Sequence, residues 1–215
     1  DSKLRIRFST SHPKDMTNDV LLVMAKYSNI CEYIHLPVQS GNSEVLEKMN
    51  RGYTRDWYLE RIEAIKTILP NAAISTDIIC GFCSETEDQH NDTLSLMKMI
   101  KYDFAYHFFY SERPKTLAER KYEDDIPVDV KKRRLREVTE IQRAHSLMHN
   151  QKYIGKVQEI LIEGPSRKSD AQFCGRNSQN AMVVFDRGET KPGDYISVLI
   201  EDCTAATLFG SIVEN

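Results

Sequence analysis

Tyr33-Ile34-His35-Leu36-Pro37-Val38-Gln39-Ser40-Gly41 is the stretch that sets the fold. Its first half is apolar and typical of a strand, whereas Pro37 and Gly41 punctuate a polar second half. Because proline has no N–H to donate, strand pairing is expected to fail at Pro37. The stretch therefore predicts a strand that ends in a loop, at the edge where α/β sheets bind ligands. The amide of Gln39 and the hydroxyl of Ser40 suit a ribose or a base, although an ordinary strand-to-helix turn fits the same residues.

Three further stretches combine strand-like residues with polar ends. Leu4–Phe8 runs into Ser9 and Thr10, Ile74–Ile79 contains Asp77, and Phe104–Tyr110 runs into a polar segment. Helical patterns separate the strands, so residues 1–110 predict βα units on a parallel sheet with right-handed crossovers. Four such strands are too few to close a barrel, which predicts an open or broken one.

Asp77 and the segment that follows it are chemically unusual. A carboxylate inside an apolar run must be paired or bind a ligand, because burying an unpaired charge is costly. Thr86-Glu87-Asp88-Gln89 has the form of a capping box and predicts the start of a helix. The free N–H groups of that helix are expected at the same edge as Gln39, where they suit a carboxylate or a purine ring.

The five cysteines are Cys31, Cys80, Cys83, Cys174 and Cys203. Their odd number and scattered spacing are typical of a reducing cytosol. Cys80-Gly81-Phe82-Cys83 has the spacing of a redox pair or of half a metal site. No second pair stands near it, and two unpaired thiols at a strand end explain the pattern as well.

Composition and charge exclude some functional classes. The formal net charge is -3, so nucleic-acid binding would need a local basic patch. No apolar run is long enough to span a bilayer and no signal-peptide pattern is present, which predicts a cytoplasmic protein without membrane contact. The chain opens Asp1-Ser2-Lys3 and enters a predicted strand at once, so we expect it to be cut from something longer.

A connector and a long helix follow the βα units. Residues 111–129 are polar, and Val130–Asn150 predicts the helix. Its basic residues are Lys131, Lys132, Arg133, Arg134, Arg136 and Arg143. A solvated bridging helix explains these residues, and so does contact with an RNA backbone.

Five short β-runs with tight turns come last, at 156–163, 171–176, 181–185, 194–199 and 206–213. They predict a small closed barrel of the OB kind. Polar and basic residues gather in its first half: Arg167, Lys168, Arg176, Asn177 and Asn180. Such barrels bind single-stranded nucleic acid on this kind of surface, although a plain accessory domain also fits. The sequence thus predicts two domains, residues 1–150 and 151–215.

Five motifs in order resemble the radical S-adenosylmethionine methylthiotransferase family: Arg5–Lys14, His35–Gly41, Asn50–Arg55, Ser75–Thr86 and Tyr110–Thr116. The tail, with Ser166-Arg167-Lys168-Ser169 and Gly175-Arg176-Asn177, is similar to the TRAM domain that follows in that family. The resemblance covers essentially the whole chain. It implies an α/β fold, with a partial (βα) TIM-like radical SAM barrel followed by a small OB-like β-barrel, the TRAM domain.

The tail is similar to the branch that adds a methylthio group to C2 of N6-isopentenyladenosine beside the tRNA anticodon. The branch acting on threonylcarbamoyladenosine stays open, and the acidic tail signature of the branch acting on a ribosomal protein is not seen. The resemblance implies S-adenosylmethionine and two [4Fe-4S] clusters as cofactors. It also implies a tRNA anticodon stem-loop as the partner, and we expect a monomer.

Site residues can be carried over from the family one by one. The cofactor-binding residues would be Ser9, Thr10, Gln39, Ser40, Arg51, Asp77 and Gly81. Arg51 would meet the cofactor's carboxylate, and the turn from Gly81 to Glu85 would pack on its adenine. The substrate and RNA contacts would be Arg113, Arg167, Lys168, Arg176 and Asn177.

The sequence departs from the family in two places. The cluster-binding Cys-x-x-x-Cys-x-x-Cys loop and the sulfur-donating domain are absent, so no residue is expected to be catalytic or a metal ligand and the chain alone is expected to be inactive. Residues 81–86 read Gly-Phe-Cys-Ser-Glu-Thr where the family usually has Gly-Phe-Pro-Gly-Glu-Thr, which leaves the shape of the adenine turn open. A stand-alone tRNA-binding module is the competing hypothesis, and it gives Asp77 no role.

Overall fold

The computed structural model describes residues 4–10, 12–167 and 169–213. They form two compact units. The sheet unit contains Phe8–Tyr27 and Ile34–Gln142, and the barrel unit contains the chain up to Arg7, Ser28–Tyr33 and the chain from Arg143 onward. In chain order the elements are η1 (Pro13–Asp15), α1 (Asn18–Lys26), β1 (Tyr33–His35), α2 (Ser43–Lys48), α3 (Arg55–Ile68), β2 (Ala73–Cys80), α4 (Glu87–Ile100), β3 (Phe104–Phe109), α5 (Leu117–Lys121), α6 (Val128–Gln151), β4 (Val157–Ser166), β5 (Ser169–Arg176), β6 (Met182–Asp186), β7 (Tyr195–Cys203) and β8 (Leu208–Ile212).

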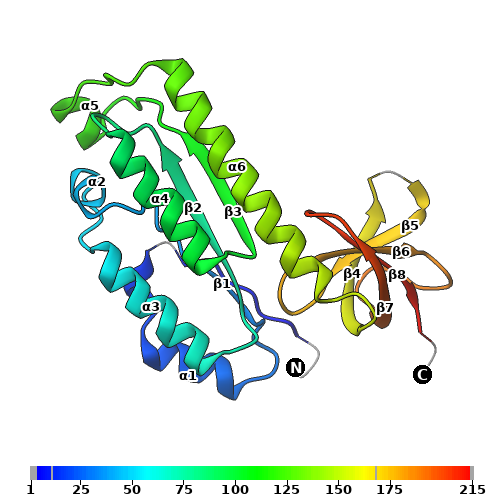
Figure 1. The fold of residues 1–215 in the computed structure, drawn as a ribbon. Helices are drawn as coiled ribbons and strands as arrows, with labels where there is room; N and C mark the ends of the chain where they lie inside the picture. The colour runs from blue at the N-terminus through cyan, green and yellow to red at the C-terminus, as the bar shows by residue number, and fades with distance from the viewer. Residues whose placement is uncertain (1–3, 11, 168, 214–215) are drawn as a thin grey trace. The chain divides into compact units, whose positions relative to one another are not determined.

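The sheet unit is built on three strands in the order β1-β2-β3 among the described residues (Figure 1). β2 and β3 run parallel, in a register that pairs Ser75 with Phe104 and Cys80 with Phe109. Beyond β1 the chain meets β2 again through a parallel bridge between Gln39 and Ile78. The loops that leave β1 and β2 therefore start at one edge of the sheet, where ligands bind in α/β folds.

The prediction of a strand over Leu4–Phe8 is wrong. In the described chain this segment makes one isolated parallel bridge, between Ile6 and Ile30. The N–H of Ile6 donates to the carbonyl of Asn29 at 2.8 Å, and no further ladder follows in the described segment. Its apolar side chains stay in solvent, with Leu4 58% and Ile6 40% exposed. Alternation predicts a strand only when a neighbouring strand covers one face, and here none does.

The helices begin largely where the sequence places them. At the start of α4 the N–H of Gln89 donates to Oγ1 of Thr86, and the N–H of Thr86 donates back to Oε1 of Gln89, which confirms the capping box. The short helix α5, inside the predicted connector, was not predicted because a single turn and a half has no visible periodicity.

Gly41 brings the loop after β1 into close contact with α4. A Cβ on Gly41 would lie 2.5 Å from the Cα of Thr93. The N–H of Gly41 donates to Oγ1 of Thr93 at 2.9 Å, and Arg55 donates to the carbonyl of Gly41 at 2.9 Å. A glycine is therefore required here by the approach of two backbones, and it fixes the loop against the helix.

The barrel unit contains a closed barrel with the strand order β4-β5-β6-β8-β7, which confirms the OB-like prediction. β4 pairs with β5 and with β7, both antiparallel, so it closes the circle. Its core consists of the buried residues Ile160, Ile162, Phe173, Val183, Phe185, Val198, Ile200 and Leu208.

We expect Gly41→Ala to lower the free energy of unfolding by about 1–3 kcal/mol, because the added methyl overlaps the backbone of α4. Urea unfolding followed by far-ultraviolet circular dichroism measures the loss. Glu47→Ala, at an exposed position of α2, is the control and should change little. Equal stability of G41A and E47A would show that the loop and α4 are not packed as described.

Candidate functional site

The loop after β1 places Gln39 beside Asp77. Gln39 adopts the left-handed backbone conformation, with φ of 72°. Its N–H donates to the carbonyl of Asp77 at 2.8 Å, and its carbonyl accepts from the N–H of Ile79 at 2.9 Å. The two candidate residues are thus backbone neighbours at the end of the sheet, as predicted from their separate strands.

Asp77 lies on an open face of the sheet. Its side chain is 30% exposed, and Oδ1 is 3.5 Å from Nε2 of His35. Asp77 pairs in register with Tyr106, and the side chains of Phe104, Tyr106 and Phe108, which share one face of β3, are 44%, 49% and 55% exposed. The carboxylate therefore has a histidine neighbour and keeps acceptor capacity for a ligand.

Arg51 is held beside the same loop. Its Nε donates to the hydroxyl of Tyr53 at 3.3 Å, and that hydroxyl is 3.1 Å from the carbonyl of Val38. Its Nη2 is buried and has no hydrogen-bond partner among the described residues. A second cation is near, since Nζ of Lys14 is 3.2 Å from the position of a Cβ on Gly52. A buried donor without a partner is costly, so this arrangement suits an anion such as a carboxylate.

Ser9 and Thr10 lead into His12, which contacts Arg51. Nε2 of His12 is 3.0 Å from the carbonyl of Arg51, and its ring centroid is 5.4 Å from that of Tyr53. The hydrogen bond gives His12 a structural partner. Thr10 is 8% exposed and Ser9 is exposed.

Ser40 does not fit the role of a ligand contact. Its side chain is fully buried, and its hydroxyl accepts from the N–H of Asn42 at 3.2 Å. The hydroxyl also lies 3.5 Å from Oγ1 of Thr93 on α4. Ser40 therefore supports the loop from inside, whereas Gln39 is only half-buried.

Gly81 begins the turn expected to contact adenine. Its φ is +69°, and a Cβ there would lie 2.5 Å from Cγ of Lys131. Its N–H donates to Oε2 of Glu85 at 2.7 Å. The N–H of Glu85 donates to the carbonyl of Phe82 at 2.9 Å, and Ser84 has φ of 58°. The 2.9 Å hydrogen bond and the left-handed Ser84 are those of a type II β-turn, although Cys83 and Ser84 stand where the resembled family has proline and glycine.

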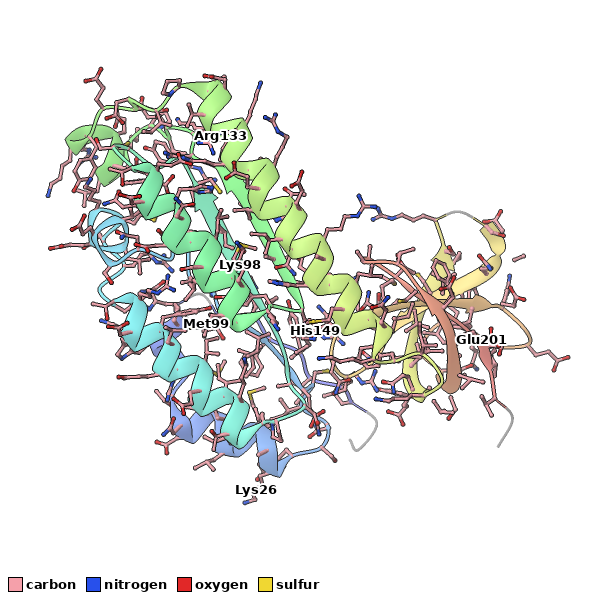
Figure 2. The ribbon with its side chains drawn as sticks, viewed as in Figure 1. Lys26, Lys98, Met99, Arg133, His149 and Glu201 are labelled. Atoms are coloured by element: carbon pink, nitrogen blue, oxygen red, sulfur yellow. The ribbon has the colours of Figure 1, made fainter. Side chains whose placement is uncertain are left out.

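A buried ion pair fastens this turn to α6. The side chains of Arg134 and Glu85 are 4% and 1% exposed, and Nη1 of Arg134 donates to Oε2 of Glu85 at 2.8 Å. Burial raises the pKa of Glu85, against the opposing effects of the Gly81 N–H and Arg134. Nη2 of Arg134 reaches Glu87 at 3.2 Å, and Arg133, labelled in Figure 2, reaches the same carboxylate at 2.7 Å.

The basic residues of α6 are therefore only partly solvated. Lys131 is 3% and Arg134 is 4% exposed, and both bind groups of the sheet unit. Lys131 forms an ion pair with Asp124 and donates to the carbonyl of Tyr110 at 3.2 Å. Both readings of α6, as a solvated helix or as an RNA contact, are wrong for these residues, because the sequence does not reveal their distant carboxylate partners.

In the barrel unit, some candidate residues are exposed and others are bound within the barrel. Arg167 is exposed in the turn between β4 and β5, whereas Lys168 lies outside the described residues. Asn177 is 1% exposed, and its side chain bonds Gln158 and the N–H of Ala181, which makes it a structural residue. Arg176 forms an ion pair with Glu163 at 3.3 Å.

The remaining candidate for an RNA contact, Arg113, lies in the sheet unit and is exposed.

Arg5 and Arg7 make structural contacts that the sequence did not predict. Nη1 of Arg5 donates to the carbonyl of Arg176 at 2.8 Å, and Nη2 of Arg7 donates to the carbonyl of Asn177 at 3.1 Å. Arg5 also pairs with Glu159 at 2.8 Å. These contacts order the loop after β5, and the alternating basic residues of 4–8 were the available signal.

The described residues do not fit an iron–sulfur cluster. Among them no group of three or more His, Cys, Asp or Glu side chains is placed to hold a metal ion. Cys80 and Cys83 are buried thiols, and burial raises the pKa of both. A raised pKa disfavours the thiolate that binds metals.

Comparison with known proteins identifies the class. The family model of the Radical SAM superfamily matches residues 1–97, and that of the TRAM domain matches residues 151–213. The chain also resembles coproporphyrinogen III oxidase of Escherichia coli, described as a radical SAM enzyme, with a TM-score of 0.56 over 83% of this chain and 47% of that chain at 15% identity. That likeness concerns the fold alone. Residues 1–97 are thus similar to the radical SAM superfamily and residues 151–213 to the TRAM domain, in agreement with the predicted resemblance.

Curated relatives with high sequence identity share one enzyme name. The chain is 60% identical to the tRNA-2-methylthio-N(6)-dimethylallyladenosine synthase of Amoebophilus asiaticus over 97% of this chain and 43% of the relative. It is 55% identical to the synthase of that name from Christiangramia forsetii, over 97% of this chain and 43% of the relative. The chain thus spans less than half the length of these relatives, and the predicted relationship to methylthiotransferases is confirmed. The superfamily implies S-adenosylmethionine and [4Fe-4S] chemistry. Among the described residues, no helix combines the length and the apolar character that crossing a membrane requires.

The carboxylate shared by Arg133 and Arg134 should make stability depend on pH. Hydrogen bonding to Arg133, then to Arg134, lowers the pKa of Glu87 from 4.5 to about 2. The carboxylate therefore stabilises the folded state fully at pH values above its ordinary pKa of 4.5, and this stabilisation is lost as the pH falls toward its pKa of about 2 in the folded state. We expect Glu87→Gln to lower the free energy of unfolding by roughly 0.5–1 kcal/mol at neutral pH, as for a half-exposed pair.

Urea unfolding at neutral and acidic pH measures this difference, which should shrink steadily between pH 4.5 and 2. Asp88→Asn, an exposed carboxylate in the same helical turn, is the control. A deficit in E87Q that is constant across this range would contradict the assignment.

Proposed function

We propose that the chain forms part of a radical S-adenosylmethionine tRNA methylthiotransferase. The reaction adds a methylthio group to C2 of N6-isopentenyladenosine, also called dimethylallyladenosine, next to the anticodon. Likeness to synthases of that name over nearly the whole chain supports the substrate. At the site, one observation carries the proposal: Arg51 holds a buried guanidinium nitrogen without a partner among the described residues, beside the strand ends.

The strand ends suit the parts of S-adenosylmethionine. Arg51 would bind the methionine carboxylate by a charge-assisted hydrogen bond, with Lys14 adding positive charge. The amide of Gln39 and the carboxylate of Asp77 would bind ribose hydroxyls or the methionine amino group. Ser9 and Thr10 would extend this edge.

The turn from Gly81 to Glu85 would pack on the adenine, and Ser40 would act only as internal support. When bound and reduced by one electron from a [4Fe-4S] cluster, S-adenosylmethionine would supply the radical that abstracts hydrogen. The residues of this chain bind it, orient it and keep water away. The proposal includes two [4Fe-4S] clusters whose ligands are residues other than those described.

The TRAM domain would grip the tRNA anticodon stem-loop. Arg167, exposed in a turn, and Lys168, beside it in sequence, would contact phosphates. Arg176 would contribute its partly exposed guanidinium, and Arg113 would line the substrate side. The amide of Asn177 has no part in this contact, because it is buried and bonded within the barrel. We also propose residues 1–150 and 151–215 as the functional domains of a monomeric cytoplasmic enzyme.

Other substrates and a stand-alone tRNA-binding role are separable by experiment. Liquid chromatography with mass spectrometry of tRNA nucleosides from a deletion strain should show loss of the 2-methylthio group from isopentenyladenosine. Loss of the methylthio group from threonylcarbamoyladenosine in the same analysis, or from a ribosomal protein in peptide mass spectrometry, would identify the alternative substrates. Unchanged modification would favour a binding module, which leaves the unpartnered Arg51 nitrogen unexplained.

We expect Arg51→Met in the complete gene product to raise the dissociation constant for S-adenosylmethionine about 10- to 100-fold, because a hydrogen bond to a charged group is lost. Equilibrium dialysis of the anaerobically reconstituted protein measures it. Arg136→Met, at an exposed position of α6, removes the same charge elsewhere and should change nothing. An R51M protein with normal stability and normal affinity would refute the assignment of Arg51.

We expect Arg167→Ala to weaken binding of anticodon stem-loops to a similar degree across sequences and to reduce the salt slope by about one, as for a lost phosphate contact. Fluorescence anisotropy over a range of salt concentrations measures both quantities. Lys98→Ala, on the exposed face of α4 (Figure 2), is the charge-matched control. A sequence-dependent loss, or none, would contradict phosphate contact.

A further inference from the structure

Ser84 has a backbone conformation that its own side chain disfavours. With φ of 58° it occupies the left-handed region at the third position of a type II turn. Glycine is the usual residue there, and the resembled family has glycine at this position, after proline. Cys83 and Ser84 lack both local preferences, so contacts from elsewhere must hold the turn.

Asp125, in the segment between α5 and α6, provides those contacts. Its Oδ1 accepts from the N–H of Ser84 at 2.6 Å, and its Oδ2 accepts from the hydroxyl of Ser84 at 2.8 Å. One carboxylate thus binds both polar groups of the residue that carries the unfavourable φ. These hydrogen bonds also lower the pKa of Asp125, so it is ionised at neutral pH.

The same segment secures the other end of the turn. The neighbouring residue Asp124 pairs with Lys131, whose stem covers Gly81 so closely that a Cβ there would lie 2.5 Å from Cγ of Lys131. The turn is thus held at Gly81 by α6 and at Ser84 by Asp125. The shape of the turn therefore depends on distant parts of the sequence, since Asp125 lies 41 residues after Ser84.

We propose that Asp125 is a positioning residue for S-adenosylmethionine, which holds the turn from Gly81 to Glu85 in the shape that receives the adenine. The inference rests on the proposed function, because that function supplies the ligand. Asp125 itself does not touch the cofactor in this proposal. It acts through Ser84, and it replaces the local preference that proline and glycine give to the turn in the resembled family.

The decisive experiment is a rescue in the complete gene product. Asp125→Ala should raise the dissociation constant for S-adenosylmethionine about fivefold to tenfold, because Ser84 loses both hydrogen bonds. Adding Ser84→Gly to D125A should restore affinity to within about twofold, because glycine adopts the left-handed conformation unaided. Glu123→Ala, a nearby exposed carboxylate, is the matched control and should bind normally.

Hydrogen–deuterium exchange without S-adenosylmethionine gives a second readout. Peptides covering 81–85 should exchange faster in D125A than in the parent protein and E123A, and S84G/D125A should recover the protection of the Gly81 N–H. Faster exchange with unchanged affinity would overturn the inference, and so would weakened affinity that S84G does not rescue. If the parent protein fails to bind S-adenosylmethionine, the proposed function itself fails, and the inference falls with it.

Discussion

The buried ion pair between Glu85 and Arg134 is the contact on which the site most depends. Its side chains are 1% and 4% exposed, so removing either partner would leave an uncompensated buried charge at a cost of about 3–5 kcal/mol. Glu85 also accepts from the N–H of Gly81, and Arg134 also reaches Glu87 at the start of α4. One pair therefore fixes the end of β2, the start of α4 and the position of α6, which together shape one edge of the sheet.

Regular elements were predictable from sequence because their signals are local. The capping box at Thr86 and the turn-separated β-runs after Tyr153 need no distant partner to be recognised. Leu4–Phe8 was mispredicted because its alternation is a strand signal only if another strand pairs with it, and the described chain offers just the bridge at Ile30. α5 was missed because five residues cannot show a helical period.

The sequence predicted that Gln39 and Asp77 lie at one edge of the sheet, but it did not predict side-chain directions. Gln39 and Asp77 come together because the carboxyl ends of neighbouring parallel strands share an edge, which is a rule of topology. The hydroxyl of Ser40 and the amide of Asn177 face inward, and the sequence records only that these residues are polar. The sequence predicts that Arg134 is exposed, whereas the structure buries it against the carboxylate of Glu85, 49 residues away.

In the turn at 81–85, the residues Cys83 and Ser84 do not favour the backbone conformation that they adopt. Proline followed by glycine encodes a type II turn by itself, whereas Cys83 and Ser84 do not. The turn nevertheless persists, because Asp125 binds Ser84 and Lys131 covers Gly81. Its shape is thus maintained by tertiary contacts where a local code would have sufficed. Such strain persists only where the surroundings over-determine it, and here the surroundings are the segment that leads into α6.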